Sequence, residues 1–129
     1  MDVCVVVPKN FTWSGALGKR GYAAWLAEGD PPNSPWSGTL WEYTTWGTQP
    51  DIQPGERVYV VCEGRLVGYA PLVRLDFELI RHAQGFVTLI RGGGAVAVTI
   101  PEPVQGFRGW RPRFWSRDQE IPVPESKEG

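Results

Sequence analysis

Turn-forming residues and large aromatic rings set the strongest limit on how this chain folds. Its 129 residues include 16 Gly, 12 Pro and 7 Trp. Gly and Pro end regular elements and large rings fill a small core, so this mixture favours short strands and many turns over long helices. A chain of this length forms one ordinary domain. We therefore expect a single, mainly β domain with a minor helical part.

The clearest local pattern is a β-hairpin in the middle of the chain. Residues 57–62 and 65–75 are rich in Val, Tyr and Leu, and they flank the pair Glu63-Gly64. Two such runs joined by two turn residues are typical of a hairpin. Pro71 cannot donate a hydrogen bond to a neighbouring strand, so it marks a bulge or an edge in the second strand.

A second strand pair is expected over residues 85–90 and 95–100, joined by Arg91 and three glycines. Glycine-rich loops also cradle phosphates, but those motifs lead into the N-terminus of a helix. In this chain, a Val-rich strand pattern follows the three glycines instead. We therefore interpret Gly92–Gly94 as a turn between two strands.

Weaker patterns place the remaining elements. Residues 1–8 are apolar and predict a strand, and residues 36–46 predict another that is rich in aromatic side chains. The best helix lies over residues 21–29, where large apolar side chains recur at helical spacing. After residue 100, prolines and glycines break any regular element, and residues 118–129 form an acidic, proline-containing tail.

Charge and cysteine usage exclude several classes of protein. The formal net charge is −1, so the chain lacks the basic field of many nucleic-acid binders and any anion-binding patch must be local. Cys4 and Cys62 lie in Val-rich strands with no second Cys or His nearby, so we interpret both as buried thiols and expect neither metal nor cofactor.

The start of the sequence shows no signal-peptide pattern, and no apolar run is long enough to span a membrane. We therefore expect a cytoplasmic protein without a membrane partner.

Residues 54–75 resemble the central hairpin of PUA-like domains. The segment opens with Pro54-Gly55-Glu56-Arg57 and continues through a strand and a tight turn into a second strand that contains Val67-Gly68. The order of the other elements extends the resemblance along most of the chain. It implies a mainly β (α+β) pseudobarrel of five to six strands with one or two short helices over residues 1–117. In various members of the superfamily, a cleft beside the barrel holds RNA, a modified base or a nucleoside-like ligand.

ASCH members of this superfamily carry a Gly-x-Lys segment that is followed by a Glu and an Arg. Gly18-Lys19-Arg20 is present here, but residues 21–25 follow it and lack the Glu on which the amidohydrolase members rely. The resemblance therefore implies binding without catalysis. His82 has neither Ser nor Cys close in sequence, and the carboxylate pair Asp76 and Glu78 is of a kind common on solvated surfaces, so neither indicates a catalytic site.

The strongest candidate site is the irregular segment 107–117, where arginines alternate with aromatic rings. Arg supplies charge and planar donor groups for phosphates or base edges, and aromatic rings stack on bases. In the structural alternative, the rings anchor the segment to the barrel while the arginines pair with Glu102, Asp118 and Glu120, or stack over Trp rings. The candidate binding residues of this segment are Arg108, Trp110, Arg111, Arg113 and Trp115.

A second aromatic group belongs to the strand expected over residues 36–46. On a strand, Trp41 and Tyr43 share one face and Trp46 lies on the other. One set belongs to the core, and the exposed set lines a pocket that residues 13 and 14 close. Large residues that only fill a small barrel are the structural alternative. The further candidates are Trp13, Ser14, Trp41, Tyr43, Trp46 and, from the ASCH resemblance, Lys19.

Three functions remain open. The first is a non-catalytic module that binds RNA, single-stranded DNA or a modified base through a cleft lined by Arg and Trp. The second is a protein-interaction or regulatory factor whose exposed Trp and Arg side chains form interface hot spots. The third is a small amidohydrolase of the ASCH kind, with Lys19 as the polar reagent and Glu42 or Glu63 in place of the missing acid. We favour the first because fold and local chemistry point the same way.

Overall fold

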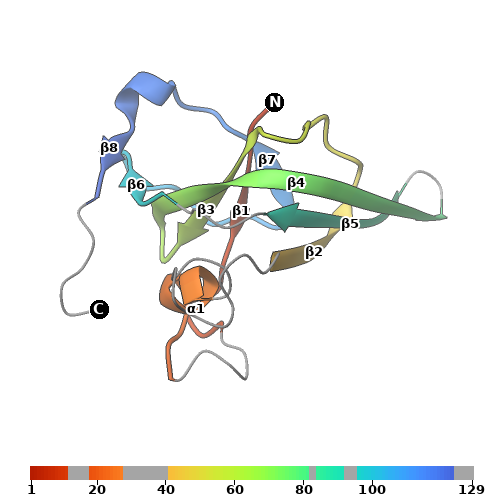
Figure 1. The fold of residues 1–129 in the computed structure, drawn as a ribbon, viewed down its shortest axis with the longest axis horizontal. Helices are drawn as coiled ribbons and strands as arrows, with labels where there is room; N and C mark the ends of the chain where they lie inside the picture. Colours follow the sequence, from red (N-terminus) through yellow and green to blue (C-terminus); the bar gives the residue numbers. More distant parts are fainter. Residues whose placement is uncertain (12–17, 28–40, 82–83, 92–95, 124–129) are drawn as a thin grey trace.

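The computed structural model describes residues 1–11, 18–27, 41–81, 84–91 and 96–123, and these form a mainly β fold (Figure 1). The elements in chain order are β1 (Val3–Val6), α1 (Tyr22–Ala27), β2 (Trp41–Gly47), β3 (Arg57–Cys62), β4 (Arg65–Arg81), β5 (Gln84–Arg91), β6 (Val98–Thr99), β7 (Trp110–Pro112), a 3-10 turn η1 (Arg117–Gln119) and β8 (Ile121–Pro122). A curled six-stranded sheet has the order β2-β5-β4-β3-β1-β7, and a second sheet pairs β6 with β8. The expected mainly β fold class is confirmed.

A parallel pair of strands, β1 and β3, lies at the centre of the packing, with Cys4 opposite Tyr59. Their sequences are nearly continuous apolar runs because parallel strands of this kind are covered on both faces. Cys4 and Cys62 are both buried free thiols, and burial raises the pKa of Cys4 to about 12. The two cysteines stand at different levels of the β1–β3 pair, since the partner of Cys4 in the register is Tyr59.

The expected hairpin of β3 and β4 is confirmed, and its turn has a specific backbone requirement. Glu63 has φ 54° and Gly64 has φ 77°. Positive φ at both central residues is what a type I′ turn needs to match the twist of the two strands. The register shifts at Val67 against β3 and at Val73 against β5, whereas Pro71, where the bulge or edge was expected, stays in register opposite Arg57.

The second hairpin was expected between residues 85–90 and 95–100, and this pairing is wrong. β4 extends to Arg81, well beyond the expected end at residue 75, and pairs with one edge of β5. The other edge of β5 pairs with β2. With both edges taken, β5 has no place for residues 95–100, and Val96 instead forms a bridge with Tyr69. The triple glycine of the expected turn lies outside the described residues.

Two buried clusters occupy opposite faces of the sheet, because alternate residues of each strand point to opposite sides. Tyr22 of α1 packs against the first cluster. The second cluster includes residues of the chain that follows β5. The first cluster consists of Val3, Val5, Val7, Ile52, Val58, Val60, Ala70, Leu72, Val87 and Leu89. The second consists of Cys4, Tyr59, Val61, Leu66, Val98, Ile100, Val104 and Trp115.

The chain after residue 117, which the sequence assigned to a tail, contributes to the fold as far as it is described. β8 pairs with β6, and the amide of Val123 donates to the carbonyl of Ala97. Figure 1 shows this small sheet at the end of the molecule opposite β2 and β5. Among the described residues, α1 is the one α-helix, and no helix has the length and apolar character needed to cross a membrane.

Candidate functional site

The candidate site is built on the C-terminal arm, by which we mean residues 107–123. The arm joins the sheet through β7, where Trp110 stands opposite Val5 and Arg111 opposite Cys4. The alternation of a strand therefore sends these two neighbours to opposite faces. Trp110 packs against the first cluster and its Nε1 donates to the carbonyl of Thr48 at 2.8 Å.

Arg111 and two phenylalanines form a surface group that we call the Phe–Arg stack, consisting of Phe107, Arg111 and Phe114. The guanidinium carbon of Arg111 lies 4.8 Å from the ring centre of Phe114 and 5.4 Å from that of Phe107. Arg111 is exposed, and Phe114 keeps 54% of its surface in solvent. A cation held against aromatic faces is attracted by their quadrupoles. The stack is therefore an ordered, exposed combination of charge and ring surface.

Asp2 connects the start of β1 to the arm. Its Oδ2 accepts hydrogen bonds from Arg113 Nε at 3.1 Å and from Arg117 Nη2 at 2.7 Å and Nε at 3.2 Å. Its Oδ1 accepts from the amide of Arg57 at 3.0 Å. The side chain of Asp2 is only 3% exposed. A buried carboxylate requires this number of donors, because an unpaired charge would be costly away from water.

The charge of Asp2 follows from the balance of these interactions. Burial by itself would raise the pKa of this carboxyl, but the donors from Arg57, Arg117 and Arg113 outweigh it and hold the pKa below its ordinary value. The bond to Asp2 in turn raises the pKa of Arg117. The clamp, by which we mean Asp2 with Arg113 and Arg117, is therefore an ion cluster at neutral pH.

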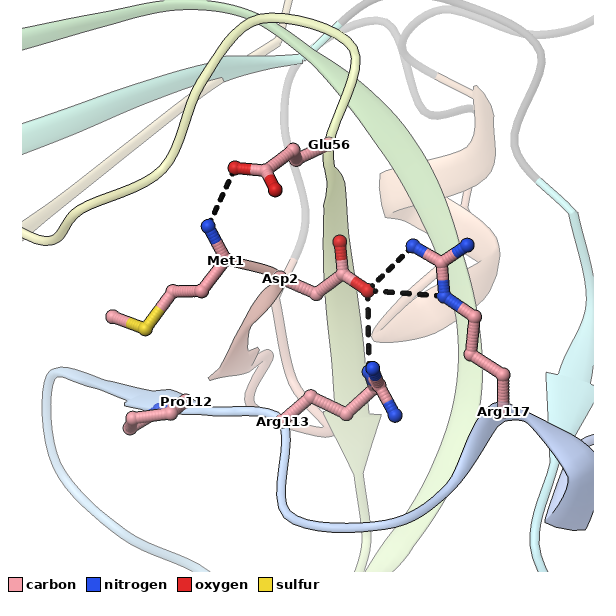
Figure 2. A pocket seen from close by; sticks show the side chains of 6 residues that line it. All are labelled: Met1, Asp2, Glu56, Pro112, Arg113 and Arg117. Atoms are coloured by element: carbon pink, nitrogen blue, oxygen red, sulfur yellow. Dashed lines mark hydrogen bonds and ion pairs between the residues drawn. The ribbon is translucent and has the colours of Figure 1, made fainter.

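An open hollow of about 290 Å³ lies beside this clamp. Figure 2 shows Asp2 between the two arginines on one side and the pair formed by Met1 and Glu56 on the other. The Met1 amine lies 2.6 Å from Glu56 Oε1. The lining residues are Met1, Asp2, Glu56, Pro112, Arg113 and Arg117.

Glu120 anchors the far part of the arm under the sheet. Its Oε2 accepts from Tyr59 at 2.5 Å and from Trp115 Nε1 at 2.9 Å, and its Oε1 lies 3.0 Å from Arg57 Nη1. The Glu120 side chain is 7% exposed. Burial and the bond to Glu120 raise the pKa of Tyr59 to about 12. Because three donors bind this carboxylate, and two of them come from β3, Glu120 holds the arm against the sheet.

The structure divides the candidates of segment 107–117 into two groups. Trp115 is buried, and the guanidinium of Arg113 bonds to Asp2 and to the carbonyl of Trp115. These contacts agree with the structural alternative, in which the segment is anchored to the barrel and its arginines form ion pairs. The ionic partner is Asp2, however, and not Glu102, Asp118 or Glu120. Arg108 and Arg111 are exposed, and within the described parts of the chain Arg108 has no ionic or hydrogen-bonding partner.

The second aromatic group belongs to β2, which ends one residue before Thr48, the residue that accepts the hydrogen bond from Trp110 of the arm. Residues 41–47 form β2, which confirms the described part of the strand expected over residues 36–46, and residues 36–40 lie outside the described residues. In β2, Trp41 stands opposite Arg91, Tyr43 opposite Leu89 and Trp46 opposite Phe86. β2 and β7 are the two outer strands of the curled sheet, and the bond from Trp110 to Thr48 joins the chain after β2 to β7. The surroundings of these three side chains, and the whole of Trp13 and Ser14, lie outside the described residues.

Lys19 and its suggested acids come from three different segments of the chain. Lys19 is exposed just before α1, Glu63 is exposed in the β3–β4 turn, and Glu42 belongs to β2. Asp76 pairs on the exposed side of β4 with Arg74 at 3.2 Å, while His82 lies outside the described residues. In the described segments, no three His, Cys, Asp or Glu residues are grouped as a metal site requires.

Sequence reasoning missed Asp2, Arg57 and Tyr59 as partners of the arm, and it named Glu120 as a partner of the arm's arginines and not of Arg57, Tyr59 and Trp115. A weak signal was present, because Asp2 and Arg57 are charged residues at the borders of apolar strands. Phe114 was treated as one ring among several, and only the structure separates it, as an exposed ring, from buried Trp115. Comparison with known protein families, with curated proteins and with solved structures found no match to this chain.

Proposed function

We propose that the protein is a non-catalytic module that binds single-stranded nucleic acid or a modified base through the Phe–Arg stack. The observation that carries the proposal is the guanidinium of Arg111, which lies against Phe107 and Phe114 and remains exposed. The PUA-like resemblance and a cytoplasmic location are part of the same proposal. The curled sheet with a short helix is consistent with that resemblance.

The chemistry of the stack fits an unpaired base. A base that stacks on an aromatic ring gains roughly 1–3 kcal/mol, and this gain is tolerant of sequence. Arg111 contacts the two rings, and among the described residues its guanidinium has no hydrogen-bond acceptor, so its N–H groups stay available for a phosphate or a base edge. Arg108, which has no ionic partner among the described residues, adds a positive charge on the same arm. With a net charge of −1, the protein is expected to bind through few phosphate contacts and to show a shallow salt dependence.

The test is a titration of fluorescein-labelled single-stranded RNA and DNA, followed by anisotropy at low and moderate salt, with competition by modified nucleosides. We expect saturable binding that weakens about tenfold or more in Arg111→Ala and Phe114→Ala, as loss of one stacked base predicts. Arg74→Ala and Val73→Ala are the matched controls, because both residues are exposed on β4. Equal affinity in all four variants, or no saturable binding by any nucleic acid, contradicts the proposal.

A protein partner is the second candidate, and exposed apolar side chains favour it. Phe114 is 54% exposed, and Ile121 and Val123 are also exposed on the arm. Exposed aromatic and Arg residues are the usual hot spots of protein interfaces. Flat nucleic-acid titrations, together with a protein captured by the wild type and lost in Phe114→Ala, would favour this candidate over the first.

A further inference from the structure

The clamp contains more donors than its carboxylate can use. Two guanidinium groups share the single carboxylate of Asp2, which leaves one positive charge at the cluster. Arg117 commits Nε and Nη2 to Asp2, and Arg113 commits Nε to Asp2 and Nη1 to the Trp115 carbonyl. A guanidinium has five N–H donors. Among the described residues, the remaining N–H groups of Arg113 and Arg117 have no acceptor.

These spare donors belong to groups that are held in place and still reach solvent. The Arg117 side chain is 50% exposed and that of Arg113 is 25% exposed, and both line the open hollow of Figure 2. Asp2 fixes their orientation from the buried side. A fixed guanidinium loses little entropy when it binds an anion, and its planar edge matches the oxygen spacing of a phosphate.

We propose that the hollow beside Asp2 is an oxyanion subsite that takes a phosphate group on Arg113 and Arg117. The inference rests on the proposed function, because Arg113 is two residues from Arg111 on the same arm. We expect a nucleic-acid strand that places a base on the Phe–Arg stack to bring a neighbouring phosphate to the hollow. Glu56 faces the same hollow, but its carboxylate bonds to the Met1 amine and to the amide of Gln53.

The subsite predicts that phosphate alone binds to the wild-type protein. The measurement is NMR of the arginine Nε–H signals during titration with inorganic phosphate at constant ionic strength. We expect the Arg113 and Arg117 signals to shift together and to saturate, while the exposed Arg74 signal changes little. Small, unsaturating shifts that are equal for all arginines would overturn the subsite.

Nucleotide probes then distinguish free phosphate from a phosphate carried by nucleic acid. We compare inorganic phosphate, uridine, uridine 5′-monophosphate and a short single-stranded oligonucleotide on the same signals. If the monophosphate binds more tightly than both phosphate and uridine, the subsite serves a nucleotide. If phosphate and monophosphate bind equally, the subsite takes the phosphate group alone.

Variants separate the failure of the subsite from the failure of the proposed function. Arg117→Gln removes a guanidinium but keeps Asp2 bonded to Arg57 and Arg113, and we expect phosphate affinity to fall at least tenfold; Arg74→Gln is the control. Phe114→Ala is expected to weaken oligonucleotide binding and leave inorganic phosphate binding unchanged. Oligonucleotide binding that persists without any phosphate response at Arg113 and Arg117 would overturn the subsite and leave the proposed function standing. Should Arg117→Gln fail to fold, the wild-type titration decides.

Discussion

The phenol of Tyr59 donates to Oε2 of Glu120 over 2.5 Å, although 61 residues separate them in sequence. Tyr59 comes from the central strand β3, and Glu120 lies beyond the end of the expected barrel domain. The same carboxylate binds Arg57 and Trp115. The arm is therefore held to the second cluster by a buried polar network, and it positions the Phe–Arg stack and the clamp.

Tyr59 is expected to resist ionisation until about pH 12. Its pKa in the folded protein is above the ordinary value of 10.0, so the associated stability is complete below about pH 10 and is lost as the pH rises towards 12. In Glu120→Gln the pKa of Tyr59 should fall but stay above 10.0, because burial is the larger cause of the shift and persists. NMR of labelled tyrosine rings measures each pKa. Glu102→Gln, on the surface, is the control, and an unchanged Tyr59 titration in Glu120→Gln would contradict the network.

The Asp2 clamp predicts a specific response to acid. The pKa of Asp2 in the folded protein is below the ordinary value of 3.8, so its stabilisation is complete above that pH and is lost as the pH falls through the lower folded value. Asp2→Asn should lower the free energy of unfolding by about 1.5–3 kcal/mol at pH 7, the usual scale for hydrogen bonds to a charged group. The difference from wild type should shrink below pH 4, as urea unfolding at several pH values will show. Exposed Asp51→Asn is the control, and a difference that does not change with pH would contradict the clamp.

Local features of the chain could be predicted from sequence because their causes are local. The β3–β4 hairpin follows from two apolar runs around Glu63-Gly64, a pair that adopts the positive φ angles of its turn. The mainly β class follows from the many turn residues. In both cases the controlling residues are neighbours in the chain, so no knowledge of distant contacts is needed.

The partners of each element could not be predicted, because they depend on contacts between distant residues. β5 pairs with β4 and β2, and no local pattern distinguishes this from a hairpin with the chain that follows. Asp2 and Arg117 are 115 residues apart. The arm is irregular, so it lacks the periodicity that would separate exposed Phe114 from buried Trp115.

Gly68 on β4 is expected to tolerate no side chain, because a Cβ at this position would clash with the Tyr22 hydroxyl and the Val96 carbonyl. Gly68→Ala should force β4 away from α1 and the Val96 bridge, at a cost of about 1–3 kcal/mol. Gly106→Ala is the matched control, since a Cβ there has no atom within 4 Å. Thermal unfolding of both variants measures the difference. Equal melting temperatures would show that α1 does not pack over Gly68.

Truncation tests whether the domain ends at residue 117 or continues through the arm. A chain that stops at residue 117 loses Glu120 and leaves the donors of Tyr59 and Trp115 without their acceptor. It also loses β8 and the bond from Val123 to Ala97. Removing one partner of a buried, charged network usually costs about 3–5 kcal/mol, so this chain should unfold at clearly lower urea concentration than wild type.

A chain that stops at residue 123 retains all of these contacts and is the control. Because Trp115 would lose its fixed environment, its near-ultraviolet circular dichroism should weaken only in the shorter chain. If the chain that stops at residue 117 is instead as stable as wild type, the domain ends there, and the network around Glu120 has no part in the stability of the fold.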